Sequence, residues 1–235
     1  MKRAMVTGAS SGIGAAVVRQ LLADGWQVIG MSRSLPPFSQ PNFRHLMVDV
    51  SQRSALLAAL EQNEQVDGVL LLLNTVGGDI EAAIRQLAAT LGNLDPQRSE
   101  SLWRLHVDAA QTLVNHFAPT MGPGGRIVLL GSRTSRGAAG RSQYAATKAA
   151  LVALARSWAA ELAPAGVTVN VVAPGATDTP MLHQPGRESS PPRLPPLGRL
   201  ITPQEVVSLV SWLLSEGASA MTGQELVMCG GASLG

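Results

Sequence analysis

A glycine-rich turn near the N-terminus constrains the fold of this chain more than any other feature. The turn reads Thr7-Gly8-Ala9-Ser10-Ser11-Gly12-Ile13-Gly14, and it lies between a short apolar run and a helical pattern that Gly25 is expected to end. Glycine lets the backbone turn sharply and approach a ligand closely, and the N-terminus of the following helix offers free N–H groups to a phosphate. Three glycines alone would suit an ordinary turn equally well, but the strand–turn–helix context predicts a dinucleotide pyrophosphate site.

Segments with strand and helix patterns alternate along the remainder of the chain. Strand-like apolar runs fall at residues 27–31, within 43–50, and at 66–73, 126–130, 167–172 and 225–228. Helical patterns cover residues 51–61, where Ser51 is expected to cap the helix, and residues 80–91, 96–119, 142–163 and 204–214. This alternation predicts the α/β class, as a doubly wound Rossmann fold with a parallel seven-stranded sheet and helices on both faces.

The chain has no internal repeat and no linker, so we expect a single dinucleotide-binding Rossmann domain over residues 1–235. Seven prolines lie between Pro180 and Pro203, which predicts an irregular loop over residues 180–203. Because ligands of such folds bind beyond the carboxyl ends of the strands, this segment is expected to act as a lid over the substrate. Candidate wall residues of that pocket are Met181, Leu182, His183 and Leu194.

Composition excludes several other classes of protein. One cysteine excludes a disulfide scaffold and a Cys-built metal site, and no two of the four histidines are four residues apart, so no metal is expected. The net charge is +2 and no Lys/Arg run reaches three, so we expect no nucleic-acid partner. The longest aliphatic run, Val69–Leu73, is far shorter than the roughly 18 residues of a membrane span, and the N-terminus leaves no room for a signal-peptide core. We therefore expect a cytoplasmic protein.

The end of the second predicted strand bears on the choice of coenzyme. A dinucleotide with a free ribose 2′-hydroxyl usually meets Asp or Glu there, whereas this chain reads Met31-Ser32-Arg33. The Arg33 guanidinium can pair with a 2′-phosphate, although a solvated surface arginine would look the same in sequence. The residues favour NADP(H) over NAD(H).

The single tyrosine of the chain, Tyr144, lies four residues before Lys148, so both side chains share one helix face. A phenol with a pKa near 10 is a poor acid–base group at neutral pH, and a neighbouring ammonium is expected to lower that pKa. Ser132, at the end of the fifth predicted strand, can hold a carbonyl or alcohol oxygen. A Tyr-x-x-x-Lys pair by itself is more often ordinary helix-surface chemistry, but the three residues together suit hydride transfer coupled to proton transfer.

The order of these motifs resembles that of the short-chain dehydrogenase/reductase family, and the resemblance covers nearly the whole chain. Residues 7–14 match the family's TGxxxGxG turn, and Asp49-Val50 match the pair that flanks the adenine. Gly131-Ser132 followed by Tyr144-Ala145-Ala146-Thr147-Lys148 match its Ser and YxxxK signature. The stretch from Asn170 to Gly175 with Thr179 matches the segment beside the nicotinamide, and Thr222-Gly223-Gln224 with Gly230-Gly231 match the C-terminal pattern.

The resemblance implies an NADP(H)-dependent oxidoreductase that interconverts a carbonyl and a secondary alcohol. It implies Tyr144 as proton donor or acceptor, Lys148 as the group that lowers the tyrosine pKa and holds the ribose, and Ser132 as the anchor of the substrate oxygen. The implied coenzyme contacts are Gly8, Ser10, Ser11, Gly12, Ile13, Gly14, Ser32, Arg33, Asp49, Val50, Asn74, Gly77, Tyr144, Lys148, Pro174, Gly175, Thr177 and Thr179.

The sequence departs from the family pattern at three places. The usual Asn-Asn-Ala-Gly after the fourth strand reads Asn74-Thr75-Val76-Gly77. The helix before the fifth strand has His106 where the family often has a catalytic Asn, with Asp108 as the candidate if the register slips by two. A histidine there could titrate near neutral pH or simply pack as a structural residue. The Ser132-to-Tyr144 spacing is one residue shorter than usual.

Two classes of function and several partners remain open. The leading function is carbonyl reduction or alcohol oxidation of a small molecule, and the alternative is a catalytically weak nucleotide-binding regulator or scaffold of the same fold. The loop after Ser132 carries Arg133, Arg136 and Arg141, which suit either an anionic substrate or solvent. The Ala-rich helix at 142–163 permits close helix packing, and the family commonly assembles through it, so a homodimer or homotetramer is expected.

Overall fold

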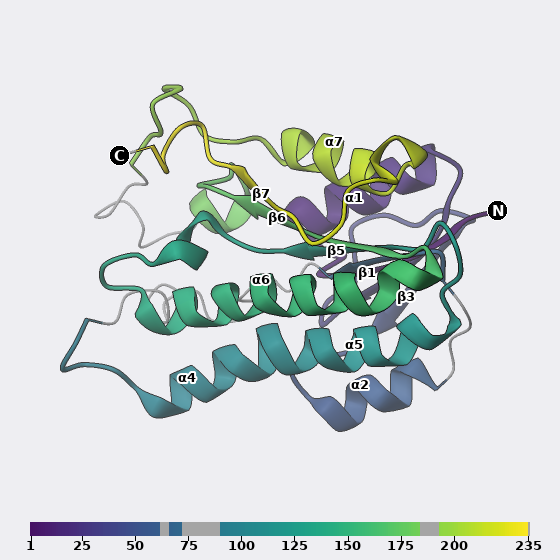
Figure 1. Cartoon of the computed structure of the whole chain (residues 1–235), viewed down its shortest axis with the longest axis horizontal. Helices are drawn as coiled ribbons and strands as arrows, with labels where there is room; N and C mark the ends of the chain where they lie inside the picture. Colours follow the sequence, from purple (N-terminus) through teal and green to yellow (C-terminus); the bar gives the residue numbers. More distant parts are fainter. Residues whose placement is uncertain (62–65, 72–89, 184–192, 235) are drawn as a thin grey trace.

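The described residues form one parallel β-sheet with helices on both sides (Figure 1). The computed structural model describes residues 1–61, 66–71, 90–183 and 193–234. Within these ranges seven strands pair in the order β3-β2-β1-β4-β5-β6-β7, and every neighbouring pair is parallel. The predicted α/β class and parallel sheet are confirmed. The strands are β1 (Arg3–Thr7), β2 (Gln27–Ser32), β3 (Phe43–Met47), β4 (Gly68–Leu71), β5 (Arg126–Leu130), β6 (Thr168–Pro174) and β7 (Glu225–Met228).

Two hydrophobic cores lie on opposite faces of the sheet. Helices α1 and α7 pack together on one face, and α2, α4, α5 and α6 lie on the other (Figure 1). Val17, Leu21 and Val210 are buried in the first core, and Leu113 and Phe117 are buried in the second. Each such side chain contributes about 1.5–3 kcal/mol through removal from water. The helices are α1 (Gly12–Ala23), α2 (Arg53–Leu60), α4 (Pro96–Trp103), α5 (Ala109–Phe117), α6 (Ser142–Leu162) and α7 (Pro203–Leu213).

The sheet reverses its winding between β1 and β4. The chain runs outward from β1 to β2 and β3, and then returns to build β4 to β7 on the other side. In a doubly wound sheet the crevice at this switch point, beyond the carboxyl ends of the strands, is where ligands bind. Thr7, Ser32 and Pro174 lie at these ends, and Ser132 follows β5 closely, so the topology gathers the predicted site residues at one edge.

Three local predictions differ from the structure or lie outside its description. Ser51 does not cap α2, because Gln52 is the N-cap residue; the Ser51 hydroxyl instead donates to Asp49 Oδ1 at 2.7 Å. The helix predicted at 96–119 is interrupted by a π-helical turn, Arg104–Asp108, between α4 and α5. Such single π turns insert an extra residue and are frequent at functional sites. The predicted strand continues beyond β4 into residues 72–73, which, like residues 80–89 of the predicted helix at 80–91, are not among the described residues; residues 90 and 91 are described and are not helical.

Candidate active site

The glycine turn has the geometry that a phosphate site requires. Gly8 and Gly12 have φ values of 67° and 54°, which disfavour any other residue. Ser11 is the N-cap of α1 but makes no side-chain capping bond, so the first N–H groups of the helix are left for another acceptor. A Cβ at Gly14 would lie 2.0 Å from the Gly8 carbonyl oxygen. The turn is therefore tight and uncapped, and it fits the pyrophosphate of a dinucleotide.

The segment after β6 lies against this turn. A Cβ at Gly12 would be only 3.5 Å from Cγ2 of Thr179, so Thr179 borders the predicted phosphate site. Thr177 is held in place because its hydroxyl donates to the Gly175 carbonyl at 3.1 Å and its backbone bridges to Ile201. The predicted coenzyme residues after β6 are therefore brought next to those after β1, although 165 positions separate Gly14 from Thr179 in the sequence.

The end of β2 also lies beside the glycine turn. The Ala9 N–H donates to the Met31 carbonyl at 3.3 Å, and the Ser34 hydroxyl donates to Ser10 Oγ at 3.1 Å. Ser32 is half-buried and hydrogen-bonded, whereas Arg33 is exposed. The guanidinium is thus available to a ligand at this edge, as the sequence predicts for a 2′-phosphate.

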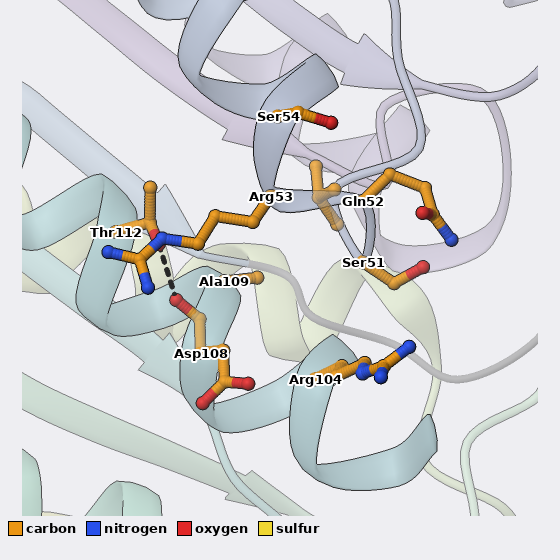
Figure 2. Close-up of a pocket in the computed structure, with 9 residues that line it drawn as sticks. Ser51, Gln52, Arg53, Ser54, Arg104, Asp108, Ala109 and Thr112 are labelled. Atoms are coloured by element: carbon orange, nitrogen blue, oxygen red, sulfur yellow. Dashed lines mark hydrogen bonds between the residues drawn. The ribbon is translucent and has the colours of Figure 1, made fainter. Parts of the chain in front are cut away.

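A polar cavity of about 310 Å³ lies between the start of α2 and the π-helical turn, and Figure 2 shows its lining. Val50 is one wall, next to Asp49, whose Oδ1 accepts from the Ser51 N–H at 3.0 Å. Asp108 also lines this cavity, and its carbonyl accepts from the Thr112 hydroxyl at 2.8 Å (Figure 2). Asp108 therefore faces α2 rather than the Tyr144 helix, which decides between the two alignments left open by the sequence.

The three predicted catalytic residues come together at the carboxyl end of β5. Ser132 follows β5, and Tyr144 and Lys148 lie one turn apart on α6. The Lys148 Nζ is 5.7 Å from the Tyr144 ring centroid and donates to the Leu130 carbonyl at 3.0 Å. Lys148 is fully buried. A buried lysine amine, a phenol and a serine hydroxyl thus meet at the same edge of the sheet as the coenzyme turn, which is an arrangement suited to proton transfer.

The pKa of the Tyr144 phenol differs from the value expected from the sequence. Burial raises the pKa of the Tyr144 phenol above its usual value, while a hydrogen bond with Ser132 and the charge of Arg141 act in the opposite direction. Burial also lowers the pKa of Lys148 to about 7. The prediction that a neighbouring ammonium lowers the tyrosine pKa is therefore wrong for the protein groups by themselves, because burial of the phenol has the largest effect on that pKa.

His106 is part of the same group. Its ring stands edge-to-face to the Tyr144 ring with centroids 5.6 Å apart, and its Nδ1 is 2.8 Å from Thr147 Oγ1. The Thr147 hydroxyl donates to the Tyr144 carbonyl at 2.9 Å, so Nδ1 must carry the hydrogen that Thr147 Oγ1 accepts. Nε2 is then a lone-pair acceptor, and it is buried with no hydrogen-bond partner among the residues that the structure describes. Burial, and secondarily the charge of Lys148, hold the pKa of His106 well below its usual value, so the imidazole is neutral at neutral pH.

Other predicted residues are engaged elsewhere or not described. Arg136 pairs with Glu225, Nε to Oε2 at 3.6 Å, and that carboxylate also accepts from Ser135. The lid prediction is described only at residues 180–183 and 193–203, where Leu194 is exposed. Asn74 and Gly77 lie outside the described residues. The sequence reading missed Thr147, although its position between Tyr144 and Lys148 in the motif was a signal, and it missed the influence of Arg141 on the phenol.

Comparison with known proteins identifies the family. A family model described as Enoyl-(Acyl carrier protein) reductase matches residues 8–233. The 3-oxoacyl-[acyl-carrier-protein] reductase FabG of Salmonella typhimurium is 31% identical over 245 residues, which cover 98% of this chain and 96% of that protein. The chain belongs to the short-chain dehydrogenase/reductase family.

Further short-chain dehydrogenases agree with this assignment. The 3beta-hydroxysteroid dehydrogenase 1 of Eggerthella lenta is 28% identical over 99% of this chain and 94% of that protein. A short chain dehydrogenase family protein from Francisella tularensis superposes with a TM-score of 0.88 at 25% identity over the full length of both chains. The structure of BdcA in complex with NADPH gives a TM-score of 0.80 at 28% identity, over 98% of this chain and 95% of that one.

This member of the short-chain dehydrogenase/reductase family is an NAD(P)-dependent oxidoreductase of the carbonyl/alcohol class. The part of the chain that the structure describes contains no helix both long and apolar enough to cross a membrane. Among those same residues, no three His, Cys, Asp or Glu side chains lie together as a metal ion would require. The group of Ser132, Tyr144 and Lys148, together with the glycine turn, is the candidate site for the oxidoreductase chemistry.

Proposed function

We propose that this protein transfers a hydride between NADP(H) and a small carbonyl or secondary alcohol, with Tyr144 as the acid–base group. The convergence of Ser132, Tyr144 and Lys148 beside the uncapped glycine turn carries the proposal. The coenzyme supplies or accepts the hydride when it is bound. In the reductive direction the Tyr144 hydroxyl gives its proton to the substrate oxygen, which the Ser132 hydroxyl holds by a hydrogen bond.

Lys148 sets the charge around the phenol. With a pKa of about 7 it is near half protonation in neutral solution, so added negative charge or hydrogen-bond acceptors at the site shift it toward the ammonium form. Protonated Lys148, whose Nζ lies 5.7 Å from the Tyr144 ring centroid, then favours the phenolate that remains after proton transfer. The contacts implied for Gly8, Ser10, Ser11, Gly12, Ile13, Gly14, Asp49, Val50, Pro174, Gly175, Thr177 and Thr179 belong to the same proposal.

The preference for NADP(H) over NAD(H) rests on the end of β2. No carboxylate follows Ser32, and the exposed Arg33 can pair with a 2′-phosphate. NADPH accompanies BdcA, one of the solved relatives, which supports the same choice. Steady-state kinetics with both coenzymes test it, and a clear preference for NADH would refute it.

A panel of carbonyl substrates assayed with NADPH tests the function itself. It should include 3-oxoacyl thioesters and steroid ketones, because relatives are named for these substrates. Turnover that Tyr144→Phe abolishes while NADPH still binds is the expected result. NADPH binding without any turnover would favour the alternative, a nucleotide-binding regulator or scaffold.

We also infer a single domain and a homodimer or homotetramer built through α6. The outer face of α6 contributes Ala149, Val152 and Ala153 to a shallow hollow of about 500 Å³, and small side chains of this kind allow close approach of a second helix. We infer as well that the protein works in the cytoplasm. Light scattering at micromolar concentration tests the assembly, and a monomer mass would contradict it.

A further inference from the structure

His45 belongs to a set of hydrogen-bonded polar side chains near the end of β2 that the proposed function does not use. It lies on β3 beside β2, and its Nε2 is 2.8 Å from Ser32 Oγ. The Ser32 hydroxyl also contacts the Ser34 carbonyl at 2.9 Å, and the Ser34 hydroxyl reaches Ser10 of the glycine turn at 3.1 Å. Hydrogen bonds made by the carbonyl and by the side chain of Ser34 therefore link a titratable side chain on the edge strand, by way of Ser32, to the turn expected to hold the coenzyme.

The hydrogen bonds determine which nitrogen of His45 carries the proton. A serine hydroxyl has one hydrogen, and Ser32 donates it to the Ser34 carbonyl. Ser32 Oγ therefore accepts from His45, which makes Nε2 the protonated nitrogen of the neutral ring. A second proton then enters at Nδ1 and leaves the bond to Ser32 intact. The imidazole can become cationic without any rearrangement at the end of β2.

Among the described residues, cations outnumber carboxylates on the segments that flank His45. Charged side chains on the neighbouring segments are Arg19 on α1, Arg33 after β2, Arg44 on β3 and Asp49 beyond β3. Three of the four are cations, and Oδ1 of the single carboxylate accepts two hydrogen bonds from the next turn of chain. Burial lowers the pKa of His45 below its usual value, so the ring is mostly neutral at pH 7. An arriving dianion would reverse that shift.

We propose that His45 is a specificity-determining residue for the coenzyme's 2′-phosphate: it takes up a proton as NADP(H) binds and, oriented by its hydrogen bond to Ser32, adds its positive charge to that of Arg33. The inference rests on the proposed coenzyme preference and deepens it. No base is needed for the step, because the proton comes from solvent and enters at Nδ1, and it returns to solvent when NADP(H) leaves. Discrimination against NAD(H) should therefore weaken as the pH rises.

Calorimetric binding of NADP+ and NAD+ tests the proposal without any turnover. The ratio of the NAD+ and NADP+ dissociation constants should fall by about fivefold between pH 6 and pH 8. A change of this size is expected from the loss of one partly exposed ion pair. Titrations at pH 7 in two buffers of different ionisation enthalpy should show net proton uptake with NADP+ that is absent with NAD+. His45→Gln keeps a donor near Ser32 and removes the charge, so both effects should shrink in that variant. The phosphate's own titration is common to both proteins and cancels in the comparison.

A second histidine provides the matched control. His116 lies on α5, packed against Phe117, and His116→Gln should bind both nucleotides like the unmodified protein. Equal pH dependence and equal proton uptake in His45→Gln and the unmodified protein would overturn the inference and leave the proposed function standing. Failure of both nucleotides to bind the unmodified protein would instead refute the proposed function, and the inference with it.

Discussion

Lys148 should make the stability of the protein depend on pH in a way that one substitution removes. The side chain is fully buried, and burial lowers its pKa to about 7, whereas in the unfolded chain it has an ordinary value near 10.4. Between these two values the unfolded state binds more protons than the folded state, so the free energy of unfolding rises with pH. Below about pH 7 both states are protonated, and this contribution to stability is at its lowest.

The size of the effect follows from the window chosen. One unit of pH within that window is worth about 1.36 kcal/mol per proton. Between pH 7.5 and 9.5 the folded lysine is mostly neutral and the unfolded lysine is charged, so the unmodified protein should gain about 2.5 kcal/mol relative to Lys148→Met. Below this range His106 would add its own titration, and above it Tyr144, whose pKa burial raises, would begin to act in the opposite sense.

Urea denaturation at pH 7.5, 8.5 and 9.5 provides the assay. The difference in slope between the two proteins reports the proton on Lys148, because the Cys229 thiol and all surface groups are common to both. A constant offset between the curves reports the contacts that Lys148 loses, including the hydrogen bond to the Leu130 carbonyl, and altered packing. Parallel curves would show that Lys148 keeps an ordinary pKa in the fold, and the account of how it charges near the phenol would then be wrong.

Three further changes have definite expected outcomes. His106→Asn keeps a donor toward Thr147 but removes the Nε2 acceptor, whereas His106→Gln keeps a group at the Nε2 position and removes the donor toward Thr147. A catalytic role of Nε2 predicts that only His106→Asn lowers kcat. Equal kcat values and pH profiles in both variants would assign the residue to packing. Gly14→Ala places a methyl group 2.0 Å from the Gly8 carbonyl oxygen and should cost about 1–3 kcal/mol in urea denaturation and weaken NADP+ binding; a neutral result would contradict the tight turn. Thr202→Ala removes the capping box of α7 and should cost about 1 kcal/mol, and an unchanged denaturation midpoint would mean that the cap contributes nothing.

Much of the fold could be read from local pattern. The glycine turn, the helix stop at Gly25 and the long helix that ends at Leu162 all agree with the structure, because each depends on neighbours within a few residues. Ser51 was wrong as a cap because the helix begins one residue later than expected, after Gln52, and the Ser51 side chain bonds locally to Asp49 instead. The π-helical turn within 96–119 could not be predicted, because the extra residue changes the face presented to α6 without changing the composition.

The sequence by itself determined the α/β class and predicted the coenzyme turn and the group of Ser132, Tyr144 and Lys148, because these depend on residue type and on spacing along one element. Only the tertiary structure decided that His106 rather than Asp108 faces the Tyr144 helix, that Thr179 borders the glycine turn, and that His45 reaches Ser32. The same holds for the raised pKa of Tyr144, since burial comes from elements far away in the chain. Contacts between distant segments depend on strand order and helix rotation, which neither periodicity nor motif spacing encodes.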